Sequence, residues 1–167
     1  MAVTEVDHQA VKNRIVEMFK ADTGIWNENN PLGRARSIDL GVPDGKQWLD
    51  IPTPYIRITN APDLESDKPF GSLVSGQTSA SYHIVKYLIM VVDQSKDAKT
   101  VEATLDNLHK AIKENLKENS QLTDPDDSSD AKCKMSHPIK TEQLQAGSFK
   151  GKSVDGFVLT LQCEMTT

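Results

Sequence analysis

The feature that most constrains the fold is a long apolar run that passes through a short polar turn into a helical pattern, over Ser81 to Asn119. One alternating set in this run reads Val85, Tyr87, Ile89, Val91, and the other reads Ile84, Lys86, Leu88, Met90, Val92. Because both sets are mostly apolar, they predict a strand that is covered on two faces. Such a strand is central in its sheet, so we expect a neighbouring strand on each side.

The second half of the run predicts the main helix, at about residues 98–119. Asp97 or Thr100 is placed to cap its first turn by accepting backbone N–H groups. Apolar residues then recur at helical spacing: Val101, Leu105, Leu108, Ile112 and Leu116. Because this spacing puts them on one stripe, we expect the helix to pack along the sheet through that stripe.

Two elements that precede the central strand follow from shorter patterns. Residues 4–20 predict a helix, which Thr4 and Asp7 begin with a capping-box arrangement. Tyr55 to Thr59 predicts a short strand led by Pro54, since proline can start a strand but cannot pair in its middle. We expect this strand and the central one to be antiparallel neighbours.

The last strand, over Val154 to Met165, has the cleanest alternation in the chain. Its apolar positions alternate with Val158, Thr160, Gln162 and Glu164, which predicts one face on the core and the other wet or at an interface. A weaker strand over residues 139–146 precedes it. The intervening GSFKGKS segment has three residues between its glycines, where a phosphate-binding loop has four, so it is interpreted as a hairpin turn.

Two long excursions interrupt these elements, at about residues 22–54 and 60–80. Both are rich in Asp, Gly, Pro and other turn formers, although the second has room for a short strand around residues 70–74. The length of 167 residues predicts a single domain, 1–167. The order of elements indicates an α+β fold, in which a small, mostly antiparallel mixed sheet is flanked by the N-terminal helix and the main helix.

Charge and residue spacing exclude several classes of function. The net charge of -5 lacks the basic footprint of a nucleic-acid-binding domain, and no apolar run is long enough for a membrane span. The cysteines, Cys133 and Cys163, and the histidines lack the spacing of zinc ligands. The acidic segment 122–130 is interpreted as a solvated loop. We therefore expect no catalytic, cofactor or metal site, and an assembly protein is favoured over an enzyme.

Four stretches carry a resemblance to a known family: HQAVKNRIVEMF, PYIRIT, YHIVKYLIMVVDQSKDAKTVEATLDNLHKAI and SFKGKSVDGFVLTLQCEM. In their order and pattern the chain resembles the tail terminator (tail completion) proteins of long-tailed bacteriophages. It departs from the compact members of that family in its excursion from Asp22 to Pro54, which is longer.

The resemblance implies a structural virion protein at the tail–neck junction, assembled in the host cytoplasm. It would form a hexameric ring of identical subunits that caps the tail tube, ends its polymerisation and joins it to the neck. The implied partners are further copies of the chain, the tail tube protein and a neck or head-completion protein. DNA would pass through the lumen without specific binding, and no membrane is involved. The candidate interface residues are Val158, Thr160, Gln162, Glu164, Trp26, Trp48, Lys68 and Phe70.

Three alternatives stay open at the level of sequence. The chain could be another phage neck or tail-tube component. It could be a small enzyme or ligand-binding α+β domain of the cytosol, although no polar groups converge in the sequence as such a pocket needs. An RNA-binding domain is disfavoured, because the polar face of the last strand has no aromatic side chains on which bases could stack.

Overall fold

The computed structural model describes residues 6–43, 50–69 and 81–166. Its helices are α1 (His8–Lys20) and α2 (Ala98–Glu118). Its strands are β1 (Ser37–Leu40), β2 (Tyr55–Pro69), β3 (Ser81–Ser95), β4 (Thr123–Asp124), β5 (Asp127–Ala131), β6 (Met135–Gln143), β7 (Gly147–Phe149) and β8 (Lys152–Thr166).

The main sheet has the strand order β1-β2-β3-β8-β6, and β7 pairs with one end of β8. Only the pairing of β1 with β2 is parallel, while the other pairings are antiparallel. The strands β4 and β5 form a separate two-stranded sheet. The predicted fold class, α+β with a mostly antiparallel mixed sheet and two flanking helices, is therefore confirmed.

The strand β3 lies in the middle of this order, between β2 and β8, as its apolar run predicts. Its register with β8 runs without a break from Tyr82↔Thr166 to Ser95↔Ser153. The predicted antiparallel pairing with β2 is also present, from Tyr55↔Val92 to Asn60↔Tyr87. These two long pairings make β3 the strand around which the sheet is built.

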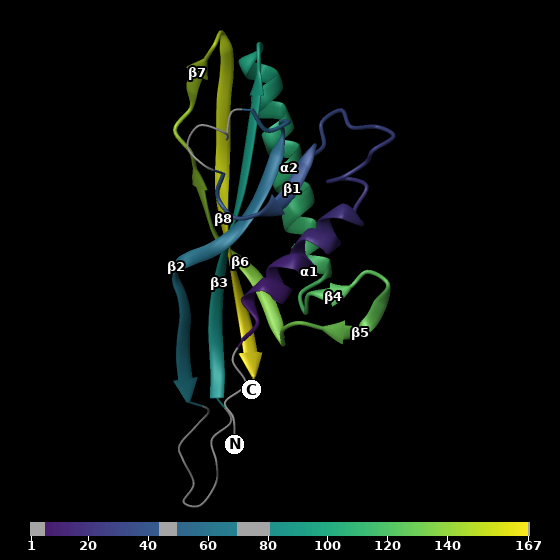
Figure 1. Cartoon of the computed structure of the whole chain (residues 1–167), viewed down its shortest axis with the longest axis vertical. Coiled ribbons are helices and arrows are strands. Elements are labelled where there is room, and N and C mark those ends of the chain that lie inside the picture. Colours follow the sequence, from purple (N-terminus) through teal and green to yellow (C-terminus); the bar gives the residue numbers. More distant parts are fainter. Residues whose placement is uncertain (1–5, 44–49, 70–80, 167) are drawn as a thin grey trace, which may run out of the picture.

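Both helices pack on the same face of the sheet (Figure 1). The predicted stripe of α2, from Val101 to Leu116, is buried, and Asp97 caps the helix by accepting from the Lys99 N–H at 3.0 Å. Burial of each such aliphatic side chain stabilises the fold by roughly 1.5–3 kcal/mol before entropy is counted. The helix face of the sheet supplies the other half of the core through Val85, Tyr87, Ile89 and the apolar set of β8.

The opposite face of β3 departs from the prediction. The sequence predicts cover on both faces, yet Ile84, Leu88 and Met90 are only half-buried, while Val92 at the end of the strand is buried. Alternation of apolar residues reports which side chains avoid water, and it does not say whether another layer of the same chain shields them. In the described part of the chain, both helices lie on the other face.

The strand β2 is longer than predicted. The sequence assigns residues 60–80 to an excursion, but β2 continues to Pro69, with a register irregularity between Asn60 and Glu65. Beyond Ile58, β1 no longer pairs with β2, so this half of β2 is an edge that tolerates proline and charged residues. The strand predicted around residues 70–74 lies outside the described residues.

Three further segments differ from expectation. The excursion 22–54 contains β1, a short strand that its turn residues conceal. The helix α1 begins at His8 and is capped by Asp7, whose Oδ1 accepts from the Ala10 N–H at 3.0 Å, while Thr4 lies outside the described residues. The acidic segment predicted as a loop forms the β4–β5 hairpin, which Arg14 of α1 holds through Asp130.

The predicted turn between β7 and β8 is confirmed. Lys150 and Gly151 both have positive φ, 49° and 76°, as the central pair of a two-residue hairpin with the favoured twist does. Because the segment turns one strand into the next, its backbone N–H groups do not form the helix-opening cradle of a phosphate-binding loop.

Candidate assembly surface

The face of the sheet that neither helix covers is the candidate site, and we call it the open face. It is defined by the half-buried side chains of β3 and β8 that point away from the helices: Ile84, Lys86, Leu88, Met90, Val158, Thr160, Gln162 and Glu164. The core fixes the strands that position these side chains, because the alternate residues of both strands are buried in it.

Apolar and polar side chains alternate across this face. The register places Met90 beside Val158, and Leu88 beside Thr160. The strand β6 continues the rows with Glu142 opposite Val158 and Lys140 opposite Thr160. Half-buried aliphatic groups framed by charged side chains make this face a candidate for contact with another protein.

Ion pairs surround the apolar groups of the open face. Lys86 Nζ lies 2.7 Å from Asp63 Oδ2, and this hydrogen bond lowers the pKa of Asp63. Lys140 and Glu142 form a second pair, in which the carboxylate raises the pKa of the Lys140 ammonium group. Solvent screens these pairs, so each contributes little to the stability of the chain.

Arg57 adds an unsatisfied donor to the same face, where the register places it beside Met90. Its Nη1 lies 3.6 Å from Asp39 Oδ2, but its buried Nε has no acceptor among the described residues. A buried donor without an acceptor costs free energy, so Arg57 is held on this face at some cost to stability.

The structure brings four of the eight predicted interface residues together. Val158, Thr160, Gln162 and Glu164 share the open face, as their alternation predicts. Trp26 lies elsewhere: its half-buried ring packs against the core beside α1, with Lys20 Nζ 5.4 Å from the ring centre. Lys68 belongs to β2, where its backbone pairs with Tyr82. Trp48 and Phe70 lie outside the described residues.

Sequence reasoning missed the β3 and β2 contributions to this face. The sequence predicts a covered face for Leu88 and Met90, because apolar alternation alone does not separate a buried layer from a partly exposed one. Arg57 gave a signal that could have been used, since a charged residue in the alternation of Tyr55 to Thr59 predicts a face that is not a dry core.

A cavity lies at His109, on the side of the sheet that carries the helices. It has a volume of about 170 Å³ and is bordered by Asp106, Asp155 and Phe157. His109 Nε2 lies 3.0 Å from Thr141 Oγ1, and its ring packs edge-on against Phe157 with centroids 4.9 Å apart. Burial and the nearby Lys113 lower the pKa of His109, against the effect of Asp106. The histidine is thereby engaged in joining α2 to β6 and β8.

Neither cysteine takes part in the open face. Cys133 and Cys163 are both buried and free, and the neighbouring Cys133 side chain together with burial raises the pKa of Cys163. In residues 6–43, 50–69 and 81–166, no group of three or more His, Cys, Asp or Glu side chains is arranged to hold a metal ion. Neither helix of this part of the chain has the length and apolar character needed to cross a membrane.

Comparisons with known proteins give little to set beside this geometry. No family model matches the sequence, and no curated protein matches it. Among solved structures, the chain is similar to a chain of the virion of a native gene transfer agent (GTA) particle. The two are 14% identical over 93% of this chain and 94% of that chain, with a TM-score of 0.42. A TM-score of this size assigns neither a shared fold nor a shared function.

Proposed function

We propose that this chain is a structural, non-enzymatic virion subunit that assembles into a ring on the end of a phage tail tube. The ring ends polymerisation of the tube and offers a surface to a neck or head-completion protein. DNA passes through its lumen without specific contacts, which the net charge of -5 favours, because an acidic surface repels phosphate groups. The sequence resemblance to tail terminator proteins supports this role.

The observation that carries the proposal is the open face. One side of the main sheet is packed under two helices, while aliphatic groups such as Leu88, Met90 and Val158 remain half-buried on the other side. Bringing a second protein onto these groups removes apolar surface from water and is favourable by roughly 25 cal/mol per Å². The face therefore supports a subunit that is completed by its neighbours.

A ring requires that the open face contact a different surface on the next subunit. Contacts between two different surfaces repeat head to tail, and they close into a ring when the rotation per subunit divides a full turn.

The direct test is the native mass of the purified chain, combined with negative-stain imaging. We expect closed rings of about six copies, since closed cyclic symmetry is common for such oligomers. A stable monomer at every concentration tested, with no assembly when tail tube protein is added, would contradict the proposal.

Charge reversal on the open face gives a sharper test. Glu164→Lys and Gln162→Lys should leave the monomer folded, because both side chains are only half-buried, and should impair ring closure. Glu114→Lys, on the exposed side of α2, is the matched control and should leave the native mass unchanged. If all three variants assemble alike, β8 does not contribute its open face to the ring.

One observation favours a second candidate, a ligand-binding α+β domain. A groove of about 290 Å³ between α2 and β6 is bordered by Lys113, Lys117, Met135 and Pro138. Thermal-shift measurements separate the candidates. The Tm of a ligand-binding domain should rise with the concentration of its ligand, whereas the Tm of a ring subunit should rise with the concentration of the protein itself.

A further inference from the structure

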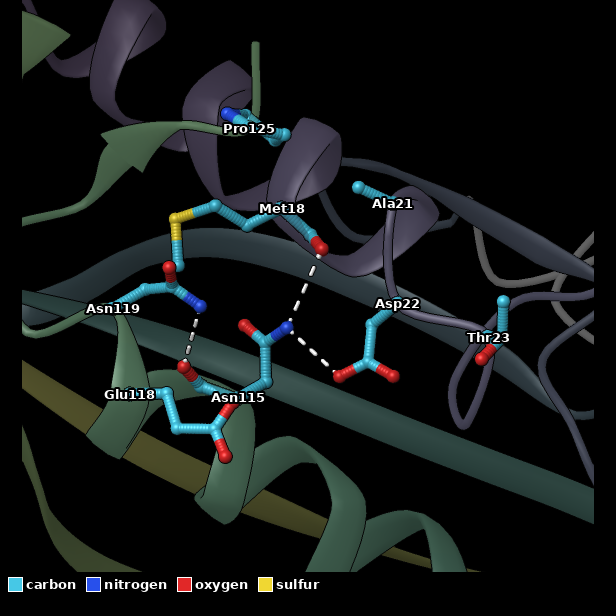
Figure 2. A pocket seen from close by; sticks show the side chains of 8 residues that line it. All are labelled: Met18, Ala21, Asp22, Thr23, Asn115, Glu118, Asn119 and Pro125. Carbon is cyan, nitrogen blue, oxygen red and sulfur yellow. Dashed lines mark hydrogen bonds between the residues drawn. The ribbon is translucent and has the colours of Figure 1, made fainter. Parts of the chain in front are cut away.

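The two helices end beside each other around a polar pocket. The pocket has a volume of about 350 Å³ and lies next to the turn that joins β4 and β5 (Figure 2). Its border includes Asp22 after α1, and Glu118 and Asn119 at the end of α2. This pocket is separate from the open face, because it lies on the side of the sheet that carries the helices.

The electrostatic potential of the pocket is negative for two reasons. The last helical residues are Lys20 in α1 and Glu118 in α2, so the C-terminal ends of both helices, with their free carbonyl groups, lie here. The C-terminal end of each helix is equivalent to about half a negative charge. The carboxylates of Asp22 and Glu118 add to them, and the described residues that border the pocket include no cationic side chain. A positively charged group is therefore attracted here.

Asn115 supplies an independent sign of a ligand. This residue is 5% exposed, and its Nδ2 donates to Asp22 Oδ2 at 2.9 Å and to Met18 O at 3.4 Å. The two acceptors fix which end of the amide faces them, so Oδ1 must point the other way. Among the described residues, no donor reaches that buried oxygen. Figure 2 shows it directed into the space beside the Met18 and Asn119 side chains.

We propose that this pocket binds an alkylammonium group. Such a group carries one positive charge for the carboxylates and helix ends, and N–H donors for Asn115 Oδ1. A metal ion fits less well, since the described residues offer no group of three His, Cys, Asp or Glu side chains arranged to hold one. The Asn119 side chain, whose Nδ2 donates to Asn115 O at 2.9 Å, borders the same residue and turns aside to admit the ligand.

The same chemistry has two sources, a free small amine or a lysine side chain of an adjoining protein. In both cases, the ammonium group enters the pocket from solvent and its alkyl stem remains outside the pocket. The inference is independent of ring assembly, because every residue that carries it belongs to the helix side of one subunit.

The test uses the full chain, titrated with methylammonium chloride at pH 7 and fixed ionic strength. We expect a saturable change in the NMR signal of the Asn115 side-chain amide and a dose-dependent rise in Tm. Tetramethylammonium has the same charge but no N–H donor, so it should give neither. An equal response to both salts, or no saturable response to methylammonium, overturns the proposal, as does tighter binding of Mg²⁺ at the same amide.

Glu118→Gln should weaken methylammonium binding roughly two- to fivefold, since one exposed ion pair of modest strength is lost. Glu114→Gln is the matched control, because Glu114 lies one turn earlier and borders the groove beside β6 instead. Equal effects of the two variants would overturn the assignment of the ligand to this pocket.

Zero-length carbodiimide crosslinking of assembled particles then identifies the source. A crosslink from Asp22 or Glu118 to a lysine of another protein supports a lysine side chain as the ligand. Methylammonium binding without such a crosslink supports a free amine.

Discussion

Asp93 shows, at the scale of one residue, how burial changes the pKa of a carboxyl group. Its carboxyl group is buried at the end of β3, where Oδ1 accepts from the Gln94 N–H at 2.8 Å. Burial raises the pKa of Asp93 to about 6, although the Gln94 hydrogen bond, Arg36 and the Thr53 hydroxyl act to lower it. The folded chain therefore holds this proton more tightly than the unfolded chain does.

This difference in pKa predicts a pH dependence of stability. The stability contributed by protonated Asp93 is fully present below about pH 4 and is lost as the pH rises through about 6. Relative to the Asp93→Asn variant, the free energy of unfolding of the wild type should fall by about 2–3 kcal/mol between pH 4 and pH 7.5. Urea unfolding of both proteins across this range measures the difference, and parallel curves would contradict it.

Arg14 is a buried charged residue whose hydrogen-bond partners make its burial possible. It is buried in α1, and its guanidinium group donates to Asp130 Oδ2 at 2.7 Å and to the Leu122 carbonyl at 3.1 Å. Arg14→Met should lower the free energy of unfolding by about 2–3 kcal/mol, because buried acceptors lose their donor. Lys12→Met, two residues earlier on the same helix, should cost less than about 0.5 kcal/mol. Urea denaturation of the two variants gives the comparison, and equal losses would assign the effect to charge alone.

At the scale of elements, the close pairing of β3 with β8 depends on a missing side chain. A Cβ at Gly156 would lie 2.5 Å from the carbonyl oxygen of Val91 and 3.0 Å from Leu144 Cδ1. Leu144 is held there because its N–H donates to the Gly156 carbonyl at 2.9 Å. Glycine at this position thus lets the end of β6 fold over β8.

Gly156→Ala should therefore destabilise the chain by about 1–3 kcal/mol, since backbone atoms of β3 have to move. Gly147→Ala is the matched control: it lies in β7 with no atom within 4 Å of the added Cβ, so its effect should be small. The midpoint of urea unfolding reports both. A loss at Gly147 equal to that at Gly156 would show that general strand entropy, and not the close contact, is responsible.

At the scale of the whole molecule, the two faces of the sheet differ. The helix side holds the core and gives the chain its stability, while the open face keeps half-buried apolar groups that the proposed ring would bury against a neighbour. In the proposed ring, the open face of one subunit would meet a different surface of the next, head to tail.

This arrangement predicts how assembly depends on concentration. A tail terminator should stop at closed rings when its concentration is raised, whereas a tail-tube subunit should continue into long tubes. Sedimentation velocity over a hundredfold range of concentration, with imaging of each sample, distinguishes the two. Tubes that lengthen with concentration would replace the terminator assignment with that of a tube subunit.

Much of the fold followed from local patterns. The stripe of α2, the central place of β3 and the two faces of β8 follow from residues close in sequence, which also narrow the cap of α2 to Asp97 or Thr100, of which Asp97 is the one used. The β4–β5 hairpin was not predicted, since Arg14 and Asp130, which hold it, are 116 positions apart. The length of β2 was missed because an edge strand tolerates the residues that usually end a strand.

The sequence by itself determined which side chains avoid water and at which period, and so it determined the α+β class and the order of its main helices and strands. Only the tertiary structure decided that both helices lie on one side of the sheet, which leaves Leu88 and Met90 half-buried on the other, and that the two helices end around Asn115. The physical reason is that periodicity is a property of one segment, whereas cover and convergence depend on which distant segments meet.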